Sequence, residues 1–119
     1  MRWKNMGKRI IFVAGVFNTK DRAVMQNNIK LIAKVSLEFM EAGYCVLTPV
    51  LMGTKILDFY NVSTAFNGMW REVSFDYIDL CTEVHVICTP GWQDSKGVME
   101  EIRYAESKNK PITYMEHTL

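Results

Sequence analysis

The segment that begins at Ser95 has the pattern of an amphipathic helix, yet an acidic residue, Glu101, lies on its apolar stripe. At about 100° per residue, Glu101 falls on the same side as Val98, Ile102 and Ala105. A carboxylate there must be paired, protonated or exposed in a cleft, because burying an unpaired charge is costly. Two interpretations remain open. Glu101 either caps backbone N–H groups or pairs with a basic residue, or it lines a functional cleft.

The start of the same segment offers a second chemical feature. Ser95 and Gly97 flank the expected first turn, where free backbone N–H groups and the helix dipole favour an anion. Ser95 also fits an ordinary N-cap, and the two roles are compatible because a phosphate or sugar hydroxyl can use the same N–H groups. The neighbouring carboxylate, Glu100, is predicted to point roughly away from the apolar stripe.

Other carboxylates precede this segment in the chain. Relative to Tyr77, the apolar centre of the preceding helical segment, Asp79 points away, and Asp76 and Glu83 lie on the flank. We interpret these three as solvent-exposed. The polar residue inside that stripe is Ser74, which is either a tolerated core hydroxyl or a cleft residue.

The loop after the first apolar run, residues 15–20, contains a single glycine. It therefore lacks both the Gly-x-Gly-x-x-Gly fingerprint of dinucleotide binding and the Gly-Lys-Ser/Thr ending of a phosphate loop, which excludes kinase and dehydrogenase functions. Gly15 either relieves a tight turn or allows a ligand to approach the backbone. Phe17 is placed to stack on a base or sugar over a crevice.

Metal and redox chemistry find no support in the sequence. His85 and His117 lack companions at metal-ligand spacing, so no metal site and no cofactor are predicted. Cys45, Cys81 and Cys88 are far apart and form no Cys-x-x-Cys pair. We interpret them as reduced core residues of a cytosolic protein.

Size and charge narrow the class further. The chain of 119 residues fits a single domain, residues 1–119. Its formal net charge is +1 and no Lys/Arg block exceeds two residues, so nucleic acid is not expected as a partner. No apolar run approaches the roughly 20 residues of a membrane span, and the first residues lack a signal peptide. The expectation is a soluble, cytoplasmic protein.

The chemistry-bearing residues are positioned by alternating strands and helices. The apolar runs predict strands at 8–14, 45–48, 84–88 and 112–115, helices at 21–42, 70–82 and 95–108, and a long loop with at most one helical turn at 50–67. Continuous apolar strands alternating with helices indicate a parallel sheet covered on both faces. The predicted fold is an α/β three-layer Rossmann/flavodoxin-like sandwich with four to five parallel strands. Ligands of such sheets bind beyond the carboxyl ends of the strands, where the loops at 15–20, 50–67 and 89–96 lie.

The pattern Gly-Trp-x-x-Ser-x-Gly-Val-x-x-Glu-Ile-x-x-Ala, from Gly91 to Ala105, precedes a Lys-Pro-Ile strand. Together with the Gly15-Val16-Phe17 loop and Trp70, it resembles the nucleoside 2-deoxyribosyltransferase-like superfamily over most of the chain. The branch that it resembles most consists of small proteins labelled as domains of unknown function, many from bacteria and phages.

The resemblance implies an activity and a set of roles. The superfamily transfers or hydrolyses at the N-glycosidic bond of nucleosides or nucleotides through a glutamate, which by position is Glu101. The carboxylate attacks the sugar C1′ through an oxocarbenium-like transition state, and water or a second group resolves the glycosyl-enzyme. Ser95 and Gly97 match positions that approach the sugar or a 5′-phosphate, and the Gly15 loop matches the segment that packs on the base.

One position departs from the family pattern. Relatives usually carry an aspartate on the preceding helix that assists the leaving base, and the corresponding residue here is Ser74. Asp76 lies two residues away and needs a register shift to serve. A serine cannot supply a proton as a carboxylic acid does. The chain is then a slow enzyme, an enzyme that uses Asp76 or the protonation of the base itself, or a protein that binds without turnover.

The expected function is therefore a nucleoside or nucleotide N-glycosidase or 2-deoxyribosyltransferase-like enzyme with a small-molecule substrate. A non-catalytic nucleotide-binding module and a structural domain without a ligand are the alternatives. The expected catalytic residues are Glu101, Asp76 and Ser74. The expected substrate-binding residues are Gly15, Phe17, Asn18, Trp70, Trp92, Ser95 and Gly97. Relatives form oligomers, so the resemblance also implies a homo-oligomer, with Trp3, Trp70 and Phe59 as candidate interface aromatics.

Overall fold

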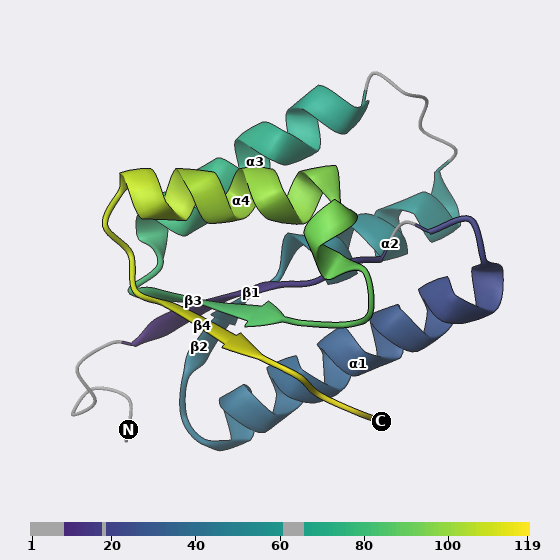
Figure 1. Ribbon diagram of the computed structural model, residues 1–119, viewed down its shortest axis with the longest axis horizontal. Helices are drawn as coiled ribbons and strands as arrows, with labels where there is room; N and C mark the ends of the chain where they lie inside the picture. Colours follow the sequence, from purple (N-terminus) through teal and green to yellow (C-terminus); the bar gives the residue numbers. More distant parts are fainter. Residues whose placement is uncertain (1–8, 18, 61–65) are drawn as a thin grey trace.

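A parallel β-sheet forms the centre of the protein. The computed structural model describes residues 9–17, 19–60 and 66–119, and within them the sheet has the strand order β2-β1-β3-β4 (Figure 1). Its strands are β1 (Ile10–Ala14), β2 (Cys45–Leu47), β3 (Glu83–Ile87) and β4 (Ile112–Met115). All three strand pairings are parallel, which confirms the predicted α/β class.

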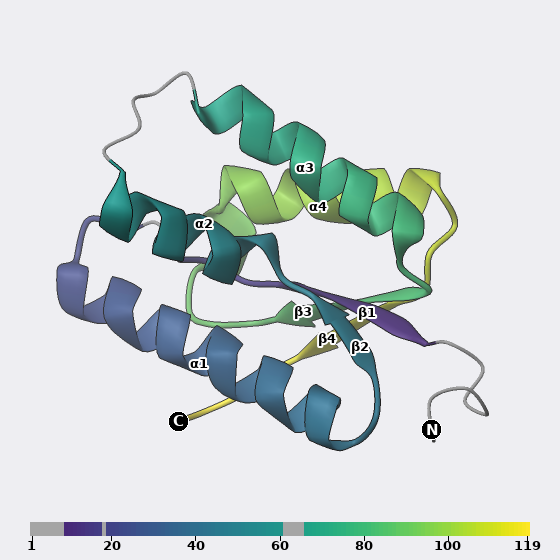
Figure 2. The same ribbon diagram turned by 180° about the vertical axis from the view of Figure 1, so that it is seen from behind.

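Helices cover both faces of this sheet. They are α1 (Arg22–Glu41), α2 (Pro49–Phe59), α3 (Phe66–Leu80) and α4 (Lys96–Ser107), with a short 3₁₀ turn, η2 (Trp92–Asp94), before α4. Figure 1 shows α3 and α4 on one side of the sheet and α1 on the other. Seen from behind in Figure 2, α2 lies between α1 and α3. This arrangement confirms the three-layer sandwich. None of the described helices is both long and apolar enough to cross a membrane.

The strand β1 explains why both faces are covered. Ile11 and Val13 point to the side of α1, whereas Phe12 and Ala14 point to the side of α3 and α4. All four are buried, as the period of two in a strand requires when each face carries a helix layer. Among the described cysteines Cys45 is exposed, so the expectation that all three are core residues is wrong for that one.

The segment predicted as a long loop is largely helical. Pro49 occupies the first turn of α2, where its missing N–H costs nothing, and Gly53 is buried in the middle of the helix. A Cβ at Gly53 would lie 3.3 Å from Cζ2 of Trp70, so the glycine lets α2 approach α3 closely. Such packing between helices contributes most of the stability of a helix in a protein, which local propensity does not reveal.

Candidate functional site

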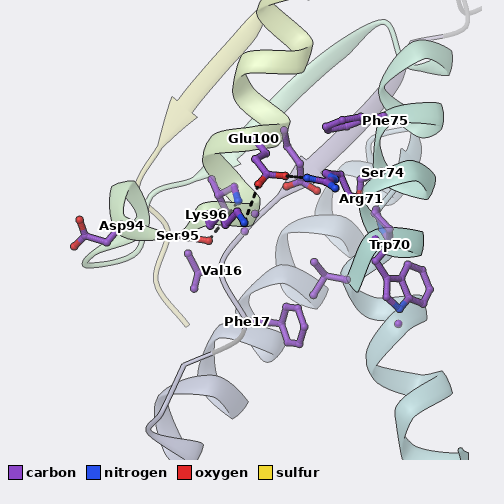
Figure 3. Close-up of a pocket in the computed structure, with 18 of the residues that line it drawn as sticks. Val16, Phe17, Trp70, Arg71, Ser74, Phe75, Asp94, Ser95, Lys96 and Glu100 are labelled. Carbon is purple, nitrogen blue, oxygen red and sulfur yellow. Dashed lines mark hydrogen bonds and ion pairs between the residues drawn. The ribbon is translucent and has the colours of Figure 1, made fainter. Parts of the chain in front are cut away.

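A pocket of about 680 Å³ opens at the carboxyl end of the sheet (Figure 3). Its walls come from the segment after β1, the faces of α2 and α3, and the first turns of α4. This is the place where parallel α/β sheets bind ligands, because the strands end there and the helix N-termini converge. Seven residues expected to act in the site line this pocket: Gly15, Phe17, Trp70, Ser74, Ser95, Gly97 and Glu101.

Glu101 contributes a partly buried carboxyl group to the pocket. Burial raises its pKa to about 7; an interaction with the Ser74 side chain lowers it, and the nearby Glu100 carboxylate raises it. Within the described part of the chain, no Lys or Arg forms an ion pair with Glu101. The helix cap is supplied by Ser95 instead. Of the two interpretations of Glu101, the geometry therefore favours the cleft.

Ser74 is the side chain of α3 that meets Glu101. It is 7% exposed and lines the pocket, so it is a cleft residue. Asp76 is exposed and does not line the pocket. Two residues along a helix correspond to a rotation of about 200°, which directs Asp76 away from the side that Ser74 occupies. Asp76 is therefore solvent-exposed, as its position on the flank of the helix predicted, and it does not line the pocket with the other residues expected to be catalytic.

Glu100 also lines the pocket, although it was expected to point away. Its side chain is 19% exposed and pairs with Nη1 of Arg71 at 3.5 Å and with Nζ of Lys96 at 3.8 Å. In Figure 3, dashed lines join it to both cations. Helical spacing predicted which side of α4 faces the sheet. It did not predict that α3 packs beside α4, so that a residue pointing away from the sheet can still line the pocket.

Arg71 and Lys96 also line the pocket, although neither was expected there. Helical spacing relates each of them to another residue of the pocket. Arg71 lies three residues before Ser74, which places both on one side of a helix, and Lys96 lies four residues before Glu100.

The first turn of α4 is capped by Ser95 and has open space beside Gly97. The Ser95 hydroxyl accepts a hydrogen bond from the Val98 backbone N–H at 3.3 Å, which confirms the capping role. A Cβ at Gly97 would have no neighbouring atom within 4 Å, so this glycine leaves part of the pocket empty. A ligand group can therefore approach the first turn of the helix without displacing a side chain.

Gly15 is required because its backbone packs closely against Ile32 of α1. Its backbone is not in the left-handed region, so it does not relieve a turn as one interpretation held. A Cβ at this position would lie 2.9 Å from Cδ1 and Cγ1 of the buried Ile32. Phe17 lies at the edge of the same pocket. Asn18, expected to bind substrate, lies outside the described residues.

The aromatic residues divide between the pocket and the rest of the molecule. Trp70 lines the pocket. Trp92 does not, contrary to expectation: it packs against the core, with its ring 5.6 Å from that of Tyr114. Its position in η2 turns it toward β4. Phe59 is 76% exposed at the end of α2. Trp3 lies outside the described residues.

Two histidines that the sequence left unconnected meet on the α1 side of the sheet. His85 Nε2 and His117 Nε2 are 2.8 Å apart beside a second cavity of about 440 Å³. Burial lowers the pKa of His85, as does the nearby His117, while Glu83 raises it. Among the residues that the structure describes, no three His, Cys, Asp or Glu side chains gather in a way that would hold a metal ion.

A family model described as "Domain of unknown function (DUF1937)" matches residues 9–117. The chain belongs to this family. The DUF1937 match extends from β1 through β4 and so includes every element that lines the pocket. No curated protein matches the chain. The description of the DUF1937 family names no activity.

Proposed function

We propose that this DUF1937 protein is an N-glycosidase or 2-deoxyribosyltransferase-like enzyme that cleaves the base–sugar bond of a nucleoside or nucleotide. One observation carries the proposal: Glu101, without a basic partner among the described residues, opens into the pocket at the carboxyl end of the sheet. The resemblance of the Gly91 to Ala105 pattern to the nucleoside 2-deoxyribosyltransferase-like superfamily supports the same role.

The proposed reaction begins with the ionised form of Glu101. A carboxylate oxygen forms a bond to C1′ while the C1′–N bond breaks and its electron pair leaves with the base. Water or another acceptor then attacks C1′ and returns the carboxylate. The pKa of about 7 means that roughly half of the molecules carry this carboxylate near neutral pH. Removal from water also makes it a stronger base than an exposed glutamate.

The rest of the pocket offers positions for the remaining parts of the substrate. The first turn of α4, at Ser95 and Gly97, suits a sugar hydroxyl or a 5′-phosphate because N–H groups and the dipole favour an anion there. Phe17 and Trp70 provide flat apolar surfaces on which a base can pack. Neither assignment depends on Trp92 or Asp76.

A homo-oligomer remains part of this proposal. The apolar side chains of Met52 and Phe59 are exposed on α2, and Leu57 of the same helix is exposed where it lines the pocket. Light scattering on the purified protein tests this, and a monomer at all concentrations contradicts it.

A non-catalytic nucleotide-binding module is the second candidate. Ser74 favours it, because a hydroxyl at this position can accept or donate a hydrogen bond but cannot protonate the leaving base as a carboxylic acid would. Such a module would retain affinity for nucleotides without releasing base.

The two candidates are separated by incubating the protein with a panel of deoxynucleosides and their 5′-monophosphates and measuring free base by chromatography. We expect release that Glu101→Gln abolishes. Glu106→Gln is the matched control, because Glu106 is exposed on the same helix and outside the pocket. Nucleotide binding without release supports the module, whereas neither binding nor release contradicts both candidates.

A further inference from the structure

The proposed reaction leaves a negative charge to be stabilised. When the C1′–N bond breaks, its electron pair moves onto the base, and the barrier depends on how that charge is met. Ser74 offers one neutral hydrogen bond next to Glu101. Asp76 points away, so a second group in the pocket must meet the charge if the reaction is fast.

Arg71 is the basic residue of α3 that lines the pocket. It lies three residues before Ser74, so that the two side chains share one side of the helix. Both line the pocket, and Figure 3 shows Arg71 reaching from α3 toward Glu100 on α4. The guanidinium therefore lies on the same wall as the serine that faces Glu101.

The ion pair that holds Arg71 is weak enough to be exchanged. Nη1 of Arg71 is 3.5 Å from Oε2 of Glu100, at the limit of a hydrogen bond, and the arginine side chain is 53% exposed. Glu100 is the only ion-pair partner of Arg71 among the described residues. A guanidinium has five N–H donors, so most of them remain free to bind a ligand. Lys96 stays beside Glu100 when Arg71 turns toward a ligand.

We propose that Arg71 binds the leaving base and stabilises the negative charge that develops on it. This inference rests on the proposed function and adds the class of base. A guanidinium stays protonated, so it supplies paired N–H donors rather than a proton. The base anion leaves with the electron pair of the C1′–N bond and then takes a proton from water. Paired donors fit a base with a carbonyl oxygen next to a ring nitrogen acceptor, as in the O6/N7 edge of a 6-oxopurine, better than adenine.

The test compares two leaving groups in wild type and variants. A guanine deoxynucleotide releases an anion, whereas its N7-methyl derivative is already cationic and releases a neutral base. We expect Arg71→Ala to lower kcat by about 100-fold or more on the guanine substrate, as loss of one charge-stabilising donor does elsewhere. On the N7-methyl substrate the loss should stay below about fivefold. Arg71→Lys should fall between, because it keeps the charge without the paired donors.

Two controls separate this role from a structural one. Arg103→Ala removes an exposed arginine of α4 that does not line the pocket, and both rates should stay at the wild-type level. Glu100→Gln releases Arg71 from its ion pair and should leave the ratio of the two rates near that of wild type. Equal losses on both substrates in Arg71→Ala, or no loss on either, overturn the inference.

The role of Arg71 in recognising the base can also be measured in a protein that does not cleave the substrate. Wild-type protein that releases base from neither the guanine substrate nor the N7-methyl substrate contradicts the proposed function. The recognition of the base is then measured by calorimetry with free hypoxanthine and adenine. Hypoxanthine binding that Arg71→Ala weakens, with adenine unaffected, supports the inference. Binding that is equal for both bases, or independent of Arg71, overturns it.

Discussion

The side chain of Ser74 on α3 interacts with the carboxyl group of Glu101 on α4, within the pocket at the carboxyl end of the sheet. The two residues are far apart in the sequence, and each is the polar exception on an otherwise apolar helix stripe. Their contact gives Glu101 one neutral hydrogen-bonding partner and leaves burial as the main influence on its pKa, which reaches about 7.

The first prediction concerns the pH dependence of the proposed reaction. Only the carboxylate form of Glu101 attacks C1′, so kcat/KM should rise about tenfold per pH unit below 7 and level off above it. Glu100→Gln removes a negative charge that raises the pKa of Glu101, so the rising limb should move to lower pH. Initial rates from pH 5 to 9 measure this. A limb that stays in place or moves to higher pH contradicts the role of Glu100.

The second prediction concerns stability. The pKa of Glu101 is raised from 4.5 to about 7 on folding, so between these values the folded state binds more protons and the free energy of unfolding falls as pH rises. Glu101→Gln should therefore stabilise the protein at pH 8, by up to about 3 kcal/mol, and have little effect at pH 4.5. Urea unfolding at both pH values measures the difference. Equal effects at the two values would show that the glutamate is not desolvated.

The third prediction separates ligand binding from folding at Gly97. A methyl group there meets no protein atom and the backbone tolerates alanine, so Gly97→Ala should keep or raise the melting temperature. It should lower nucleotide affinity, because the methyl group takes up pocket space beside the helix N–H groups. Gly68→Ala is the matched control: Gly68 also has free space and lines the same pocket, but lies on α3 away from the start of α4. Equal losses of affinity in both variants would argue against a binding role for the first turn of α4.

The fourth prediction concerns His85. Burial and His117 lower its pKa from 6.5, so the folded state binds fewer protons and stability should be lost as pH falls below 6.5. Their Nε2 atoms are 2.8 Å apart, which requires one ring to donate and the other to accept. His85→Leu should reduce this loss, and His117→Leu should reduce it less, because burial is the larger cause.

Urea unfolding at pH 7.5 and 5.0 tests this prediction. Glu101 changes stability in the opposite direction over part of this range, so each variant is compared with wild type at the same pH. An acid-induced loss of the same size in wild type and His85→Leu would contradict it.

The local pattern of the chain was enough to predict the four strands and the positions of Glu101 and Ser74. A continuous apolar run such as β1 becomes a strand covered on both faces, and helical spacing decides which side chains share the side that faces the sheet. These are properties of neighbouring residues, so the sequence alone determined them.

Other features depended on which elements pack together. Gly53 lets α2 pack closely against Trp70 of α3, and Glu100 of α4 pairs across the pocket with Arg71 of α3. His85 and His117 meet only after the chain folds back. Contacts between segments that are distant in the sequence arise from the way the layers pack, which no local period encodes. Only the tertiary structure therefore decided which charges surround Glu101.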